Sequence, residues 1–205
     1  MVSSLQILPA VDRRRIHRIQ AITIAWLSAE VLIGMWAAWG AMSPAMTAFA
    51  GDSAIELFSA LVVLWRFRSS TVGEHEERRA ARIAGGLLFL LALYVLVVSA
   101  FALLGYREAQ PTYLGIGLLA AAIVIMPWLA REKRRLSYKT GSAALGADAA
   151  QSALCAYLSL LALVGLALNA LWHTGWADPV AAIVITPLIV WEGREAMRGR
   201  ACGCC

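Results

Sequence analysis

Six apolar segments, each about as long as a membrane-spanning helix, constrain this chain more than any other feature. We place them at 19–40, 45–66, 81–105, 112–130, 143–171 and 177–198. A helix rises about 1.5 Å per residue, so about 20 residues cross a hydrocarbon core of about 30 Å. A composition that is 60% hydrophobic is also too apolar for an ordinary soluble domain. The sequence predicts an all-α, multi-pass membrane protein with six transmembrane helices.

The basic residues indicate how the chain is oriented. If the helices alternate in direction, 17 of the 18 Lys and Arg residues fall on one side of the membrane and only Arg107 on the other. The 17 are Arg13, Arg14, Arg15, Arg18, Arg66, Arg68, Arg78, Arg79, Arg82, Arg131, Lys133, Arg134, Arg135, Lys139, Arg194, Arg198 and Arg200. Basic residues concentrate in short cytoplasmic loops, so we expect both termini in the cytoplasm. Because these residues flank apolar segments instead of forming one stripe with aromatics, we expect no nucleic-acid partner.

The domain organisation follows from the same pattern. We expect residues 1–18 to form a basic cytoplasmic segment, residues 19–198 a six-helix transmembrane domain in the lipid bilayer, and residues 199–205 a Cys-rich cytoplasmic tail. The first apolar segment is too long for a signal peptide and contains Glu30. With no targeting peptide recognised, we expect a bacterial inner (plasma) membrane.

Acidic residues inside the apolar segments are the main functional signal. Glu30, Asp52, Glu56 and Asp148 all lie within predicted spans, where an Asp at a helix centre costs about 2.5 to 3.5 kcal/mol by insertion scales. Asp52 and Glu56 are four residues apart, so a helix places both carboxyl groups on one face. We expect no Lys or Arg within the spans to neutralise them. Such a pair would hold a proton, bind a cation, or do both.

The fifth segment supplies a matching stripe, because Asp148, Gln151 and Cys155 are spaced i, i+3 and i+7. If the second and fifth spans touch, carboxylate oxygens and one thiol converge on a site that suits Zn²⁺ or Cd²⁺ better than Mg²⁺ or Ca²⁺. Each residue also has a structural reading. Cys155 could be a small buried hydrophobe, Gln151 an interhelical hydrogen-bonding residue, and Asp148 a helix cap or the partner of Lys139. Glu30 could relay protons, add a secondary ligand, or bond to a neighbouring helix.

Three cysteines close the sequence, at Cys202, Cys204 and Cys205. Thiolates bind soft metals, so this tail could capture an ion in the cytoplasm. A structural disulfide is not expected in a reducing compartment.

The segment from Ala50 to Ala60, with Asp52 and Glu56, resembles the second transmembrane helix of the cation diffusion facilitator family, which sets two metal-binding acids four residues apart. Leu145 to Ala149, followed by Gln151 and Cys155, resembles the fifth helix. There Gln151 and Cys155 stand where the family commonly carries His and Asp. Trp176 to Pro179 resembles the start of the sixth.

The resemblance implies a homodimeric exporter that exchanges Zn²⁺, Cd²⁺ or a related divalent ion for protons by alternating access. It implies a secondary transporter and no enzyme, with no catalytic residues and no cofactor. Two departures bear on this expectation. Few residues follow the sixth segment, so we expect the family's usual cytoplasmic domain to be missing. Gln151 in place of His also removes a group that titrates near neutral pH.

Two other functions remain open. One is a membrane-embedded metal sensor or assembly protein that binds ions through its cysteine tail without moving them. The other is a proton-coupled carrier of small organic cations, which would use the same acids as counter-charges. No aromatic residue adjoins Asp52 in the sequence, as such a carrier would favour.

Overall fold

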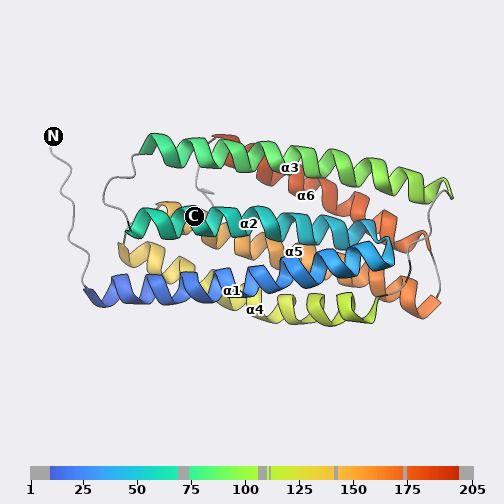
Figure 1. Cartoon of the computed structure of the whole chain (residues 1–205), viewed down its shortest axis with the longest axis horizontal. Helices are drawn as coiled ribbons and strands as arrows, with labels where there is room; N and C mark the ends of the chain where they lie inside the picture. Colours follow the sequence, from blue (N-terminus) through green and yellow to red (C-terminus); the bar gives the residue numbers. More distant parts are fainter. Residues whose placement is uncertain are drawn as a thin grey trace.

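The computed structural model describes residues 10–68, 74–105, 110, 112–140, 143–172 and 175–198. These residues form six helices: α1 (Ala10–Ala41), α2 (Pro44–Arg68), α3 (Glu74–Leu103), α4 (Tyr113–Thr140), α5 (Ala143–Trp172) and α6 (Ala177–Arg198). Figure 1 shows them running along the long axis of one elongated bundle. The predicted all-α, six-helix fold is therefore confirmed.

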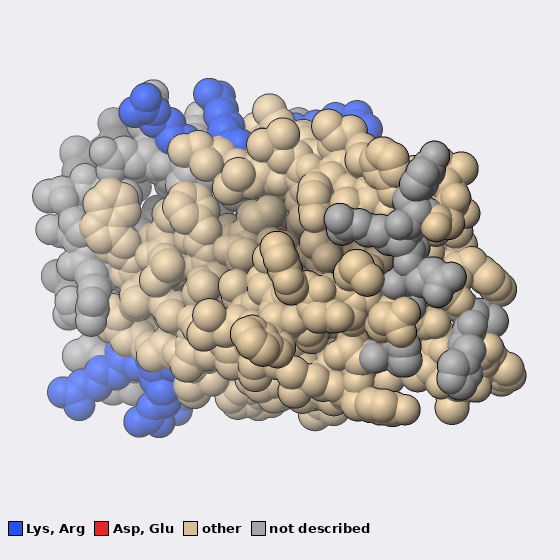
Figure 2. Space-filling model, turned by 45° about the vertical axis from the view of Figure 1, so that its right-hand side comes forward, with Lys and Arg blue, Asp and Glu red and all other residues tan. Residues whose placement is uncertain are grey.

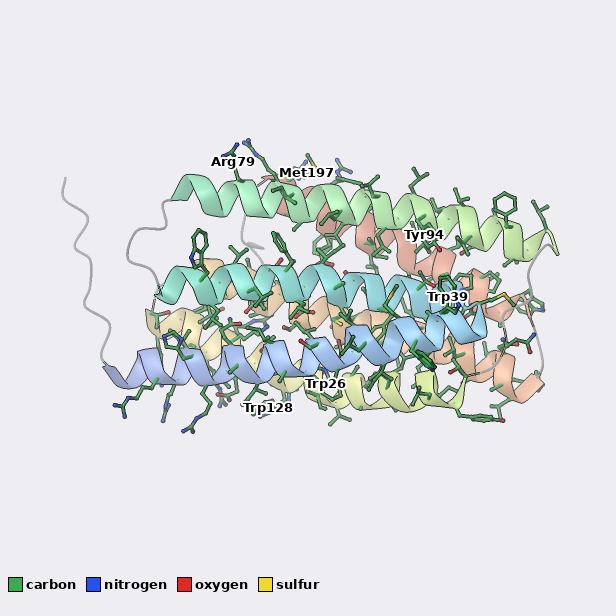
Figure 3. All side chains as sticks on the ribbon, viewed as in Figure 1. Trp26, Trp39, Arg79, Tyr94, Trp128 and Met197 are labelled. Carbon is green, nitrogen blue, oxygen red and sulfur yellow. The ribbon has the colours of Figure 1, made fainter. Side chains whose placement is uncertain are left out.

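Five of the six helices are long and apolar enough to cross a membrane by length and composition, namely those that contain Arg14–Ala41, Pro44–Trp65, Arg82–Leu103, Tyr113–Thr140 and Leu145–Trp172. The sixth, α6, is the shortest and carries Asp178, Glu192 and Arg194 beside its apolar residues. Figure 2 shows Lys and Arg along the upper margin and at the lower left of the face in view, with a wide tan surface between them. In Figure 3, Arg79 and Trp39 lie toward opposite ends of the bundle. The chain is thus a multi-pass membrane protein.

Helices α2 and α5 occupy the middle of the packing. Helix α2 contacts α1, α3, α5 and α6, while α5 contacts α2, α4 and α6. The strongest pairings are α4 with α5, α3 with α6, and α1 with α2. The second and fifth spans do touch, which is the condition for their polar residues to converge.

Close packing of α3 on α6 depends on two glycines. A Cβ atom added to Gly85 would lie 2.7 Å from the carbonyl oxygen of Gly193, and one added to Gly193 would lie 3.2 Å from the carbonyl oxygen of Gly85. Small residues let membrane helices approach this closely. A larger side chain at either position would push the two helices apart.

The turn between α1 and α2 is fixed at both ends. Helix α1 ends with Met42 in a left-handed conformation (φ 50°) and with the Ser43 amide donating to the Ala38 carbonyl at 3.2 Å, as in a Schellman motif. Ser43 then caps α2, because its Oγ accepts from the Met46 amide at 3.0 Å and donates to Asp178 Oδ1 at 2.7 Å. Asp178, one of the residues that carried the family resemblance, thus ties the start of α6 to the start of α2.

Helix α4 differs from the sequence prediction. The predicted span ended at 130, but the helix continues to Thr140 and buries Lys133 and Leu136. Helix α4 therefore buries two residues beyond the predicted span, and one of them, Lys133, carries a basic group into the interior of the bundle.

Candidate metal-transport site

Besides Asp178 at the start of α6, five carboxyl groups are buried in the bundle. The exposed fractions are 0% for Glu30, 3% for Asp52, 2% for Glu56, 1% for Asp148 and 6% for Glu192. We call these five residues the carboxyl cluster. They come from α1, α2, α5 and α6, and the face drawn in Figure 2 correspondingly carries no patch of Asp or Glu. The acids predicted from the sequence do turn away from lipid, as intramembrane acids usually do.

Lys133 of α4 lies in the middle of this acidic region. Its side chain is fully buried, and its Nζ lies 2.9 Å from Asp148 Oδ1 and 3.7 Å from Glu56 Oε1. Every other Lys or Arg whose side chain the structure describes is exposed. The expectation that no basic residue within the spans neutralises the acids is therefore wrong. The error has a physical origin, since α4 stays helical past 130 and turns Lys133 inward.

Asp148 is held from two sides. Its Oδ1 accepts from Lys133, and its Oδ2 accepts from Gln20 Nε2 of α1 at 2.6 Å. The alternative in which Asp148 pairs with Lys139 is wrong, because Lys139 is exposed and Lys133 takes that place. Asp148 therefore links α1, α4 and α5.

Ser152 continues the network toward α2. Its Oγ accepts from Lys133 Nζ at 2.7 Å and donates to Glu56 Oε1. Within the part of the chain that the structure describes, Glu56 Oε2 has no hydrogen-bond partner. One oxygen of Glu56 is thus engaged and the other is available.

Glu30 joins a second group of contacts. Its Oε1 accepts from Trp26 Nε1 and its Oε2 from Ser53 Oγ at 2.9 Å. Cys155 Sγ lies 4.0 Å from Glu30 Oε2 and 3.9 Å from Ser53 Oγ. The structure therefore supports the expectation that Glu30 bonds to a neighbouring helix, and it places the Cys155 thiol beside that carboxyl.

Asp52 faces α6. Its carboxyl group interacts with that of Glu192, which also interacts with the side chain of Gln151 on α5. This placement is in line with the reading of Gln151 as an interhelical hydrogen-bonding residue. Two ionised carboxylates in contact repel each other, so the pair is stabilised when one of them holds a proton.

The five predicted ligands therefore lie in two linked groups. Glu56 and Asp148 share Lys133, whereas Asp52, Gln151 and Cys155 lie in the contacts around Glu192 and Glu30. Among the described residues, no three His, Cys, Asp or Glu side chains are arranged so that they could hold a metal ion. Lys133, Ser53 and Ser152 take up the oxygens that such an ion would need. Cys202, Cys204 and Cys205 lie outside the described residues.

Two buried charged residues of this region, Lys133 and Glu192, were not predicted from the sequence, although a signal was present for both. Lys133 continues a buried stripe on α4, which consists of Ala122, Met126, Leu129, Lys133 and Leu136. Glu192 continues a similar stripe on α6, which consists of Ala182, Ile185, Ile189 and Glu192. A charged residue at the next position of an apolar stripe faces the same neighbours. Gln20, Ser53 and Ser152 carry no comparable signal.

The chain is similar to proteins of a known transport family. The family profile described as the cation efflux transmembrane domain matches residues 21–198. The chain is 28% identical over 156 residues to the manganese efflux system protein MneS of Bacillus subtilis (strain 168), covering 72% of this chain and 53% of that protein. It is 24% identical over 193 residues to the uncharacterized transporter sll1263 of Synechocystis, covering 90% of this chain and 62% of that protein. The chain thus spans between half and two thirds of each relative's length.

Proposed function

Because the chain belongs to the cation efflux family of membrane transport proteins, we propose that it exports a divalent metal ion from the cytoplasm in exchange for protons. The observation that carries this proposal is the imbalance of buried charge. Apart from Asp178, which accepts from Ser43 at the start of α6, five buried carboxyl groups and one buried basic group, the ammonium of Lys133, are found among the described side chains. Buried charges must be paired, protonated or bound to a metal. The surplus acids suit alternating occupation by protons and by a divalent cation.

Asp52 and Glu56 are the proposed first ligands. They project from the same face of α2 toward α5 and α6, and Glu56 Oε2 has no hydrogen bond to give up. Asp148, Gln151 and Cys155 complete the proposed set once their present contacts break. Rocking of the helices would then open this site to the outer side, where protons replace the metal.

Proton exchange is supported by the contact between the carboxyl groups of Asp52 and Glu192. If this pair holds a proton, Asp52 loses it before binding a cation with full charge. Metal binding would therefore release a proton from this pair. Export driven by the proton gradient follows from the same step run in reverse on the outer side.

Zn²⁺ or Cd²⁺ is the proposed substrate because Cys155 offers a thiol among the carboxyl groups. Mn²⁺ is a second candidate. Oxygen atoms greatly outnumber the single sulfur in the region, Mn²⁺ prefers oxygen ligands, and one relative is named a manganese efflux protein. Substitution of Cys155 distinguishes a Zn²⁺ or Cd²⁺ substrate from a Mn²⁺ substrate.

We also propose that two copies of the chain form the working unit, as the family resemblance implies. Chemical cross-linking in native membranes tests this directly. A chain that runs only as a monomer after cross-linking would contradict it.

Metal tolerance in cells tests the proposed function. Cells that express Asp52→Asn should lose the tolerance to external Zn²⁺, Cd²⁺ or Mn²⁺ that the wild type gives, with the same amount of protein in the membrane. Glu132→Gln is the matched control, because Glu132 is 32% exposed and pairs only with Arg135 in the described residues. Full tolerance with Asp52→Asn would contradict the assignment of this residue.

A further inference from the structure

Lys133 is bonded to oxygen atoms that a transported cation would use. Its ammonium group donates to Asp148 Oδ1 and to Ser152 Oγ, and it lies 3.7 Å from Glu56 Oε1. Asp148 and Glu56 are also two of the proposed metal ligands. The ammonium and a metal ion therefore cannot both hold these oxygens.

We propose that Lys133 is a tethered competitor for the substrate: it occupies the carboxyl cluster when no ion is bound, and an arriving divalent ion displaces it. This inference rests on the proposed function and adds a residue that sets affinity and selectivity. Lys133 has the geometry for this role, because an unbranched four-carbon stem carries its charge and can swing without moving the helix.

The contacts of Lys133 also favour displacement over a fixed structural bond. Its distance of 3.7 Å to Glu56 Oε1 exceeds hydrogen-bonding range, while Ser152 Oγ bridges the two groups. Glu56 Oε2 is free to meet an ion before the lysine leaves. A cation can therefore bind one oxygen first and take the others as Lys133 withdraws.

A tethered ammonium discriminates by charge. At equal distance a divalent ion gains twice the Coulomb energy of a monovalent one from the same carboxylates. A sodium or potassium ion only matches the single charge of Lys133, which is already in place at high effective concentration. Divalent ions can displace the lysine, and monovalent ions are excluded.

The test compares Lys133→Met with Lys139→Met in purified full-length protein. These are the only two lysines of the chain, and Lys139 lies exposed on the same helix. We expect Lys133→Met to bind Zn²⁺ and Mn²⁺ at least about tenfold more tightly than the wild type, because one competing charge is gone. We also expect sodium chloride, but not choline chloride at the same ionic strength, to weaken metal binding in Lys133→Met only. Folded Lys133→Met with unchanged or weaker metal binding would overturn the inference.

If Lys133→Met does not fold, NMR of the wild type tests whether metal displaces Lys133. With ¹⁵N-labelled lysine the chain gives two side-chain nitrogen signals, and saturating metal should shift that of Lys133 while that of Lys139 stays in place. A Lys133 signal that does not move at saturation overturns the inference. Metal binding by the wild type with a static Lys133 contradicts this inference alone. Absence of metal binding in both the wild type and Lys133→Met contradicts the proposed function as well.

Discussion

The carboxyl groups of Asp52 on α2 and Glu192 on α6 interact directly with each other. Both side chains are buried, with exposed fractions of 3% and 6%. Two such groups hold one proton more easily than two negative charges, and metal binding at Asp52 would release that proton. The pair therefore connects the occupancy of the proposed metal site to the proton concentration.

Glu192→Gln should reduce the pH dependence of metal binding. The glutamine amide can still donate to Asp52, but it cannot release a proton. In the wild type, affinity for the metal should rise with pH, because protons and metal compete for the same carboxyl groups. The slope of log Kd against pH counts the protons released when the metal binds, and we expect its magnitude to be smaller by about one in the variant. Isothermal titration between about pH 6 and pH 8 measures this slope.

Glu195→Gln is the control for that experiment. Glu195 lies one turn further along α6 and pairs with Arg198 at the surface. Its substitution should leave the slope unchanged. An equal slope in Glu192→Gln and the wild type would show that Glu192 takes no part in proton exchange.

Cys155→Ser should change which metal is preferred. The thiol lies 4.0 Å from Glu30 Oε2, and Cys155 is one of the proposed ligands. Loss of the sulfur should weaken Cd²⁺ and Zn²⁺ binding by about tenfold or more, while Mn²⁺ binding changes by less than about threefold. Competition binding with the three ions measures the ratio. If all three affinities stay the same, Cys155 is only a small buried side chain.

Ser43→Ala should destabilise the end of the bundle at which α1 joins α2. The substitution removes the cap of α2 and leaves Asp178 Oδ1 without its hydroxyl donor. A lost N-cap costs about 1 kcal/mol, which corresponds to about 2–4 °C in Tm for a chain of this size. Thermal unfolding in detergent checks this against Ser28→Ala, since Ser28 Oγ donates only to the carbonyl of Ile24 within its own helix. Equal Tm values for the two variants would contradict the capping role.

Deletion of residues 202–205 separates export from sensing. If the chain transports metal, losing Cys202, Cys204 and Cys205 removes a capture site and should lower transport only in part. If the chain is a sensor that binds metal through its tail, the same deletion should abolish its response. Metal tolerance at several external concentrations distinguishes a partial loss from a complete one.

The helices and the buried acids could be predicted from the sequence because both follow from strong local signals. Apolar segments of spanning length identify helices, and an acid within such a segment must face the protein interior. Asp52, Glu56 and Asp148 were found in this way. The contact between Gln151 and the acids also matched one of the two readings of that residue.

The role of Lys133 could not be read from composition because it lies in a run of basic residues, Arg131 to Arg135, which resembles a cytoplasmic loop. Only the continued helical register of α4 turns one of these residues inward. Glu192 was obscured in a similar way by the charged end of α6. The partners of these residues come from other helices, so they depend on packing that no local pattern encodes.

Transport itself is tested most directly in proteoliposomes that carry a pH gradient. We expect the wild type to take up Zn²⁺, Cd²⁺ or Mn²⁺ in proportion to the gradient, and Asp52→Asn to lose this uptake while Glu132→Gln retains it. Absence of gradient-driven uptake of all three ions by intact wild-type protein would contradict proton-coupled export.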